Sequence, residues 1–214
     1  MPAQRARLLV ADDHMVVVEG ISKLLLPSYE IVGTARDGRE LIEAAQRLKP
    51  DVILLDISMP LMNGIEAARR LRRLLPATKI VILSMHSEPE YVREALRVGA
   101  SGYVLKSSAS SEVIKAVEEV LLGRYYVTPQ IAAAPADLIR QARSARHMLP
   151  GELTPRQREI LQLVAEGRGT KEIASLLKIS AKTVESHKST IMERLNLHSL
   201  AALTYYAVEH GITG

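Results

Sequence analysis

The sequence predicts an α/β domain followed by a separate all-helical domain, and three features carry this prediction. Over residues 1–125, apolar segments of strand length alternate with helical patterns. Residues 126–150 are rich in proline, alanine and arginine, which indicates a linker. Residues 151–214 show only helical periods. A chain of 214 residues is long enough for two such domains.

Five segments of the first domain have the composition of buried strands. They are predominantly apolar, which is typical of strands covered on both faces in a parallel sheet. They occupy residues 7–11, 31–35, 52–55, 80–83 and 103–105.

Five helical patterns separate and follow these strands. They occupy residues 16–26, 39–48, 65–75, 89–98 and 111–122. Strands that alternate with helices predict a parallel sheet with helices on both faces. In such sheets ligands bind beyond the carboxyl ends of the strands, so the strand ends are where functional residues are expected.

The linker and the second domain follow. Within the linker we expect a helix near residues 136–146. Four further helices are predicted at residues 155–165, 171–177, 181–195 and 200–209. A compact helical domain of about 60 residues is small but feasible.

Composition excludes several classes of protein. The chain has no cysteine, which excludes disulfides, cysteine-ligated zinc and a thiol nucleophile. It has no Trp and no Phe, so base stacking on aromatic side chains is not expected. No apolar run approaches the ~18 residues of a membrane span and no signal peptide is evident, so we expect a cytoplasmic protein with no membrane partner. The net charge of +4 is too small to indicate nucleic-acid binding by itself.

Polar residues end four of the predicted strands. Asp12 and Asp13 follow the first strand, Asp56 the third, Ser84 the fourth and Lys106 the fifth. Carboxylate oxygens are ligands that suit Mg²⁺, and a lysine and a hydroxyl can contact phosphoryl oxygens. Taken singly, each residue is more often a cap or a solvated loop residue than a functional one. Together, at the carboxyl edge of one parallel sheet, they predict a site where a carboxylate accepts a phosphoryl group.

Residues 8–106 resemble a response-regulator receiver domain. The matching segments are Val10-Ala-Asp-Asp-His14, Asp56-Ile-Ser-Met-Pro60 with Asn63-Gly64, Leu83-Ser84, and Gly99-Ala-Ser-Gly-Tyr-Val-Leu-Lys106. The resemblance implies a flavodoxin-like (βα)5 fold with strand order 2-1-3-4-5.

The resemblance also implies roles for individual residues. Asp56 would be the phospho-acceptor, and Mg²⁺ would be held by Asp12, Asp13, Asp56 and the backbone carbonyl of Ser58. Ser84 and Lys106 would contact the phosphoryl group, and Tyr103 would be the switch aromatic; core packing alone is the alternative for Tyr103. His14 and His86 are interpreted as loop residues, not as ligands.

Two helices of the second domain have the spacing of a helix-turn-helix. Thr170 is a plausible N-cap of the first helix, and Ser180 of the second. A short turn between two helices is the geometry that places the second in the major groove of DNA. Val184, Ile191 and Leu195 should face inward. The outward-facing residues are Lys182, Glu185, Ser186 and Ser189.

This pattern resembles the helix-turn-helix of the LuxR/FixJ family. The matching segments are Leu153-Thr-Pro-Arg-Gln-Arg-Glu-Ile-Leu161, Gly167, Lys171-Glu-Ile-Ala174 and Lys182-Thr-Val-Glu-Ser-His-Lys188. The resemblance implies that double-stranded DNA is contacted by Thr170, Lys171, Lys182, Thr183, Ser186, Lys188 and Ser189. A solvated helix face is the alternative for these polar residues.

The last predicted helix is apolar on more than one side, which favours a homodimer interface that includes Leu200, Leu203, Thr204 and Tyr206. Packing within the helical core would explain these residues as well.

The two resemblances together point to a NarL/FixJ-type response regulator, a transcription factor switched when a sensor histidine kinase phosphorylates Asp56. It would not be an enzyme beyond its own phosphoryl transfer and dephosphorylation. A phosphatase with an aspartyl-phosphate intermediate is the enzymatic alternative, but Ser58 stands where that class has a second aspartate. The second alternative is a binding module, in which the receiver serves only as a dimerisation platform and is not phosphorylated.

Overall fold

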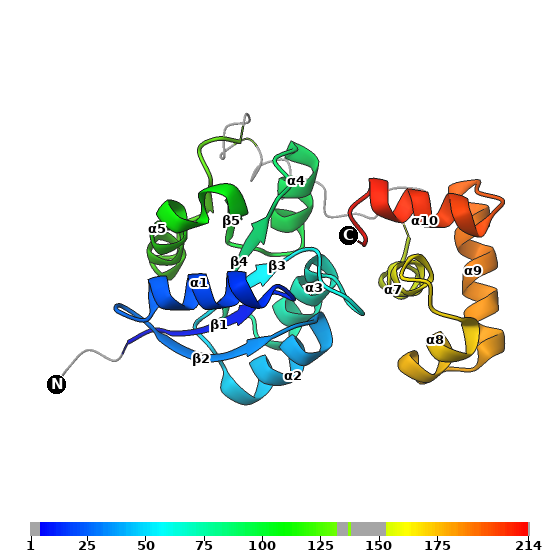
Figure 1. Cartoon of the computed structure of the whole chain (residues 1–214), viewed down its shortest axis with the longest axis horizontal. Helices are drawn as coiled ribbons and strands as arrows, with labels where there is room; N and C mark the ends of the chain where they lie inside the picture. Colours follow the sequence, from blue (N-terminus) through cyan, green and yellow to red (C-terminus); the bar gives the residue numbers. More distant parts are fainter. Residues whose placement is uncertain (1–4, 132–136, 138–152, 214) are drawn as a thin grey trace.

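The computed structural model describes residues 5–131, 137 and 153–213 and contains a six-stranded parallel sheet (Figure 1). The strand order is β2-β1-β3-β4-β5-β6, which confirms the predicted α/β architecture. The strands are β1 (Arg7–Ala11), β2 (Glu30–Ala35), β3 (Val52–Asp56), β4 (Lys79–Ser84), β5 (Gly102–Leu105) and β6 (Tyr126–Val127).

Helices cover both faces of this sheet and form two separate layers of core. One layer contains side chains of α2 (Gly38–Leu48), α3 (Gly64–Leu74) and α4 (Pro89–Arg97). The other contains side chains of α1 (Met15–Leu25) and α5 (Ala109–Leu121). Every residue of β3 is buried, because both layers pack against this central strand.

The sheet extends further along the chain than the sequence predicted. Tyr126 and Val127 were expected in the linker, but they form β6 and pair with β5. The Thr128 hydroxyl accepts a hydrogen bond from the backbone of Leu105, and Ile131 is buried in the core. The apolar side chains at the start of the linker therefore complete the first domain. The helix predicted near 136–146 lies outside the described residues, except for residue 137.

The second domain consists of α7 (Pro155–Ala165), α8 (Thr170–Leu177), α9 (Ala181–Leu195) and α10 (Leu200–Glu209), as predicted. Its core contains Ile160, Leu161, Ile173, Val184, Ile191, Leu203 and Ala207. Thr154 begins α7 with a capping box, in which its hydroxyl accepts from the Gln157 backbone and the Gln157 side chain accepts from the Thr154 backbone. Pro155 at the first helical position adds to this start signal.

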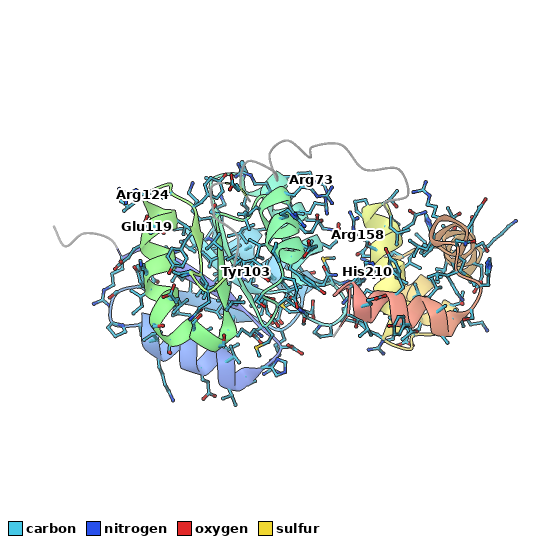
Figure 2. The ribbon with its side chains drawn as sticks, turned by 90° about the horizontal axis from the view of Figure 1, so that it is seen from above. Arg73, Tyr103, Glu119, Arg124, Arg158 and His210 are labelled. Carbon is cyan, nitrogen blue, oxygen red and sulfur yellow. The ribbon has the colours of Figure 1, made fainter. Side chains whose placement is uncertain are left out.

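The helical domain packs against the first domain through α7, the end of α8 and the end of α10. Arg70 of α3 forms a 2.9 Å ion pair with Glu159 of α7. Helix α9 lies on the side of its domain that is away from the first domain (Figure 1). Figure 2 shows Arg158 and His210 on the side of the helical domain that faces the first domain. No helix in the described part of the chain is long and apolar enough to span a membrane.

Candidate functional site

The four groups predicted at strand ends meet at one edge of the sheet. Asp12 directly follows β1, Asp56 and Ser84 are the last residues of β3 and β4, and Lys106 directly follows β5. These four strands are neighbours in the order β1-β3-β4-β5, and all are parallel. The parallel register therefore brings side chains from residues far apart in the sequence to a single rim.

Lys106 joins the two buried carboxylates of this rim. Its Nζ lies 2.7 Å from Asp12 Oδ2 and 3.0 Å from Asp56 Oδ2. Asp12 is fully buried and Asp56 is 2% exposed, so neither carboxylate is well solvated. Burial raises the pKa of Asp56, and the Asp12 charge raises it further, while Lys106 and a hydrogen bond from the Ser58 backbone oppose this shift. Burial lowers the pKa of Lys106, but the two carboxylates outweigh burial and raise it overall.

An acidic cluster suited to a divalent cation surrounds this pair. One ligand atom from each of Asp12, Asp13, His14 and Asp56 lies within 4.8 Å of the others. Asp12 Oδ2 and Asp56 Oδ2 are buried and accept no hydrogen bond of good geometry, although both are within ion-pair distance of Lys106. Partly unsatisfied carboxylate oxygens around an accessible Asp13 fit a hard cation that prefers oxygen ligands.

His14 is the residue of this cluster that the sequence did not single out as a site residue. Its backbone N–H donates to Asp12 Oδ1, and its ring nitrogen lies 2.9 Å from Asp13 Oδ1. The side chain is 66% exposed. The sequence feature that could have identified His14 is its position directly after the two aspartates, because a loop residue at that position must lie beside them.

Ser58 lies in the loop between β3 and α3, and its N–H donates to the Asp56 carboxylate. Its carbonyl as a metal ligand remains a prediction. Gly64 ends the same loop, and a Cβ at this position would collide with the backbone carbonyl of Asp56. The loop therefore depends on a glycine to pass close to the acidic cluster.

Ser84, His86 and Tyr103 form a second group beside the carboxylates. Ser84 Oγ accepts a 3.1 Å hydrogen bond from the His86 backbone, and the Tyr103 hydroxyl donates to the His86 carbonyl at 2.8 Å. Tyr103 is fully buried in the interior of the first domain (Figure 2), and this burial raises its pKa. The His86 ring stacks on Tyr91 of α4 with centroids 4.1 Å apart. The side chain of His86 thus connects the rim to α4.

The polar face of α9 is open to solvent. Ser180 caps the helix by accepting from the Thr183 backbone, while Val184 and Ile191 are buried. The residues on the exposed face are Lys182, Thr183, Glu185, Ser186 and Ser189. Lys188 is only partly exposed, and its ammonium contacts Glu185 at 3.1 Å.

Thr170 does not have the predicted role as N-cap of α8. Gly169 is the N-cap and has no side-chain hydrogen bond, whereas Thr170 is the first helical residue. The Thr170 hydroxyl donates to the Glu185 carboxylate of α9 instead. The Thr170 hydroxyl thus makes a tertiary contact instead of a local cap. The neighbouring residue, Lys171, is exposed.

The α10 residues proposed as a dimer interface lie in different surroundings. Leu203 is 1% exposed and belongs to the helical core, so it is not available to a second chain. Tyr206 is half-buried and lines a cavity of about 440 Å³ between the two domains. Leu200 is exposed, and the Thr204 hydroxyl donates to the Leu200 carbonyl. Tyr205 and Val208, which the sequence analysis did not single out, are 70% and 54% exposed.

Comparisons with known proteins give the same division of the chain. Residues 8–118 match the response regulator receiver domain, and residues 151–207 match the bacterial regulatory proteins of the luxR family. The second match is a family of bacterial regulatory proteins.

Two relatives match nearly the whole chain. The oxygen regulatory protein NreC of Staphylococcus carnosus is 38% identical over 211 residues, covering 95% of this chain and 97% of NreC. The transcriptional regulatory protein MctR of Rhizobium johnstonii is 35% identical over 210 residues, covering 97% of this chain and 95% of MctR.

Solved structures agree at the level of the fold and the family. A structure of the Salmonella typhimurium RcsB response regulator has a TM-score of 0.66 at 29% identity and covers 97% of this chain and 98% of RcsB. RcsB bound to the promoter P1flhDC with the phosphomimetic BeF3⁻ has a TM-score of 0.63 at 30% identity, covering 95% and 98%. With both domains matched in order and whole-length relatives above 30% identity, this chain belongs to the NarL/FixJ-type two-component response regulators, transcription factors in which a receiver domain precedes a LuxR-type DNA-binding domain.

Proposed function

We propose that Asp56 accepts a phosphoryl group from a sensor histidine kinase and that this modification controls DNA binding by α9. The observation that carries the proposal is the position of Lys106, whose ammonium lies within 3.0 Å of both Asp12 and Asp56. A lysine held between two buried carboxylates can bind the oxygens of a phosphoryl group added to one of them.

In this phosphoryl transfer Asp56, Lys106 and Ser84 have different roles. An Asp56 carboxylate oxygen forms a bond to phosphorus as the phosphorus–nitrogen bond of the donor phosphohistidine breaks, and the histidine leaves with the bonding electrons. Lys106 neutralises charge on the phosphoryl oxygens, and the Ser84 hydroxyl donates to one of them. Catalysis in this step is mainly positioning and charge stabilisation.

Mg²⁺ is the cofactor that the acidic cluster favours. Asp12, Asp13, Asp56 and the Ser58 carbonyl would hold it, and it would supply charge neutralisation to the phosphoryl oxygens. The fit rests on the carboxylate oxygens that gather within 4.8 Å and on two buried oxygens, Asp12 Oδ2 and Asp56 Oδ2, that share the single ammonium of Lys106.

DNA is the expected partner of the exposed face of α9. RcsB, at 28% identity and a TM-score of 0.57, has been solved as dimers bound to DNA. For this chain we infer a dimer whose α10 contributes the exposed Leu200, Tyr205 and Val208, with Leu203 remaining in the core. A dimer of this kind binds two half-sites about one DNA turn apart.

The test of the acceptor is Asp56→Asn in the full-length chain. Incubated with a radiolabelled small phosphodonor and Mg²⁺, the parent protein should incorporate label and Asp56→Asn should not. Asp51→Asn is the matched control, because Asp51 lies at the opposite end of β3, where its carboxylate accepts a hydrogen bond from the Arg7 backbone. Labelling of Asp56→Asn to the level of the parent would show that another residue is the acceptor.

A further inference from the structure

His14 places its imidazole ring beside the acidic cluster instead of capping the helix that follows it. It is the N-cap residue of α1, but its side chain makes no capping hydrogen bond. Its backbone N–H donates to Asp12 Oδ1 at 2.9 Å, which holds the residue against the cluster. The ring nitrogen Nδ1 lies 3.2 Å from Asp12 Oδ1 and 2.9 Å from Asp13 Oδ1. The turn between β1 and α1 thus brings an imidazole nitrogen next to two carboxylates.

The imidazole adds a nitrogen donor to a set of carboxylate oxygens. One ligand atom from each of Asp12, Asp13, His14 and Asp56 lies within 4.8 Å of the others. Asp12 and Asp56 are 0% and 2% exposed, and their Oδ2 atoms share the single ammonium of Lys106. Asp13 and His14 are exposed, so an ion can reach the cluster from solvent. The donor set is therefore three carboxylates and one imidazole, open on one side.

This donor set differs in kind from a set of oxygens alone. Carboxylate, carbonyl and water oxygens suit Mg²⁺, whereas imidazole suits transition-metal ions such as Zn²⁺ and Ni²⁺. Mg²⁺ also loses its bound water reluctantly, so it gains little from a nitrogen donor. A nitrogen ligand should therefore raise the affinity for Zn²⁺ much more than the affinity for Mg²⁺.

The spacing of the atoms agrees with this chemistry. Ligands bind tetrahedral zinc at about 2.0–2.2 Å, which places two ligand atoms about 3.4 Å from each other. The His14 nitrogen and Asp12 Oδ1, at 3.2 Å, already have nearly this separation. A hydrogen bond between the ring and an aspartate has a similar length, so the experiment must separate a ligand from a residue that only orders the aspartates.

We propose that His14 is a nitrogen ligand of the divalent-cation site and makes this site prefer a transition-metal ion such as Zn²⁺ to Mg²⁺. The inference rests on the proposed function, because the same carboxylates hold the ion beside Asp56. Without His14, the carboxylates and the Ser58 carbonyl form an oxygen set that favours Mg²⁺. Phosphorylation of Asp56 then depends on which divalent ion occupies the site, and one exposed side chain decides that occupancy.

The experiment titrates Zn²⁺ and, separately, Mg²⁺ into the full-length protein by calorimetry. His14→Ala should weaken Zn²⁺ binding at the cluster about tenfold or more and change the Mg²⁺ affinity less than about twofold. His14→Gln should behave like His14→Ala, because a carboxamide is polar but offers no nitrogen lone pair to a metal. His198→Ala removes an exposed histidine between α9 and α10 and is the matched control, which should retain both affinities of the cluster.

Two further measurements identify the site and the ligand atom. Asp13→Asn removes an oxygen ligand and should weaken the binding of both ions, which locates the titrated site at the cluster. Proton–nitrogen correlation spectra of the histidine rings report on the ligand atom, and the His14 signals are identified by their absence from His14→Ala. One ring nitrogen of His14 should shift strongly on addition of Zn²⁺ and little on addition of Mg²⁺.

The outcomes separate the inference from the proposed function. Equal factors of loss for the two ions in His14→Ala would show that His14 only orders the aspartates, and would overturn the inference. Unchanged Zn²⁺ affinity in His14→Ala, or a His14 ring signal that does not respond to Zn²⁺, would overturn it as well. Each of these results leaves the Mg²⁺ site and the labelling of Asp56 in place. A parent protein with the same affinities as Asp13→Asn for both ions would refute the cation site of the proposed function and the inference with it.

Discussion

The ammonium nitrogen of Lys106 lies 3.0 Å from a carboxylate oxygen of Asp56. The same nitrogen is 2.7 Å from Asp12, so one cation compensates two buried carboxylates. Burial is the main cause that raises the pKa of Asp56, and the neighbouring Asp12 charge adds to it, so the cluster suits an added divalent cation. Stability and function are therefore linked at this rim.

Removal of Lys106 should destabilise the receiver domain. Lys106→Met leaves Asp12 and Asp56 buried without a cation, which should lower the free energy of unfolding by about 2–4 kcal/mol at neutral pH. Mg²⁺ should recover part of the loss, since it binds the same carboxylates. Urea unfolding with and without Mg²⁺ measures both effects. Lys23→Met, an exposed position on α1, should change stability little.

Removal of the Asp56 charge should stabilise the protein in a pH-dependent way. Because the pKa of Asp56 is raised in the folded state, the folded state binds more protons than the unfolded state. Ionised Asp56 therefore lowers the free energy of unfolding once the pH exceeds the pKa of this group in the unfolded chain. Asp56→Asn should therefore have a Tm about 2–4 °C above that of the parent at pH 7. The difference should shrink on acidification, as the folded Asp56 becomes protonated. A difference that is constant across the pH range would contradict this account.

Two glycines should respond in opposite directions to alanine. Gly64→Ala places a methyl group against the backbone carbonyl of Asp56 and should cost about 3 kcal/mol or more. Gly20→Ala, within α1 and with open space around its Cβ position, should stabilise by about 0.5–1 kcal/mol. Denaturant unfolding of both variants is the measurement. Equal effects would show that the collision at Gly64 is relieved by movement of the loop.

The Tyr103 hydroxyl should matter for signalling more than for stability. Tyr103→Phe removes one hydrogen bond, to the His86 carbonyl, and should cost about 1 kcal/mol of folding free energy. The gain in DNA affinity on phosphorylation should fall, because Tyr103 no longer ties the His86 segment to β5. DNA titrations with and without phosphorylation test this. An unaltered gain would remove the hydroxyl from the switch.

The lysines of α9 should contribute to the salt dependence of DNA binding. Lys182→Ala should weaken binding to all sequences about equally and reduce the slope of log K against log salt by about 0.9. Lys188→Ala should have a similar or smaller effect, since its ammonium is already paired with Glu185. Salt titrations of DNA binding compare the two variants. An unchanged slope in Lys182→Ala would place this residue outside the DNA contact.

The sequence by itself determined the element types, the parallel sheet and the rim that joins Asp12, Asp56, Ser84 and Lys106. Each of these follows from a local pattern, because apolar runs indicate buried strands and parallel strands end at one edge. The pairing of strand β6, the bond from Thr170 to Glu185, the burial of Leu203 and the insertion of Gln162 beside Met59 were decided only by the tertiary structure. These contacts depend on how completed helices and strands pack against one another. Gln162, for example, is 103 residues from Met59 in the sequence, so no periodicity or local sequence pattern specifies their contact.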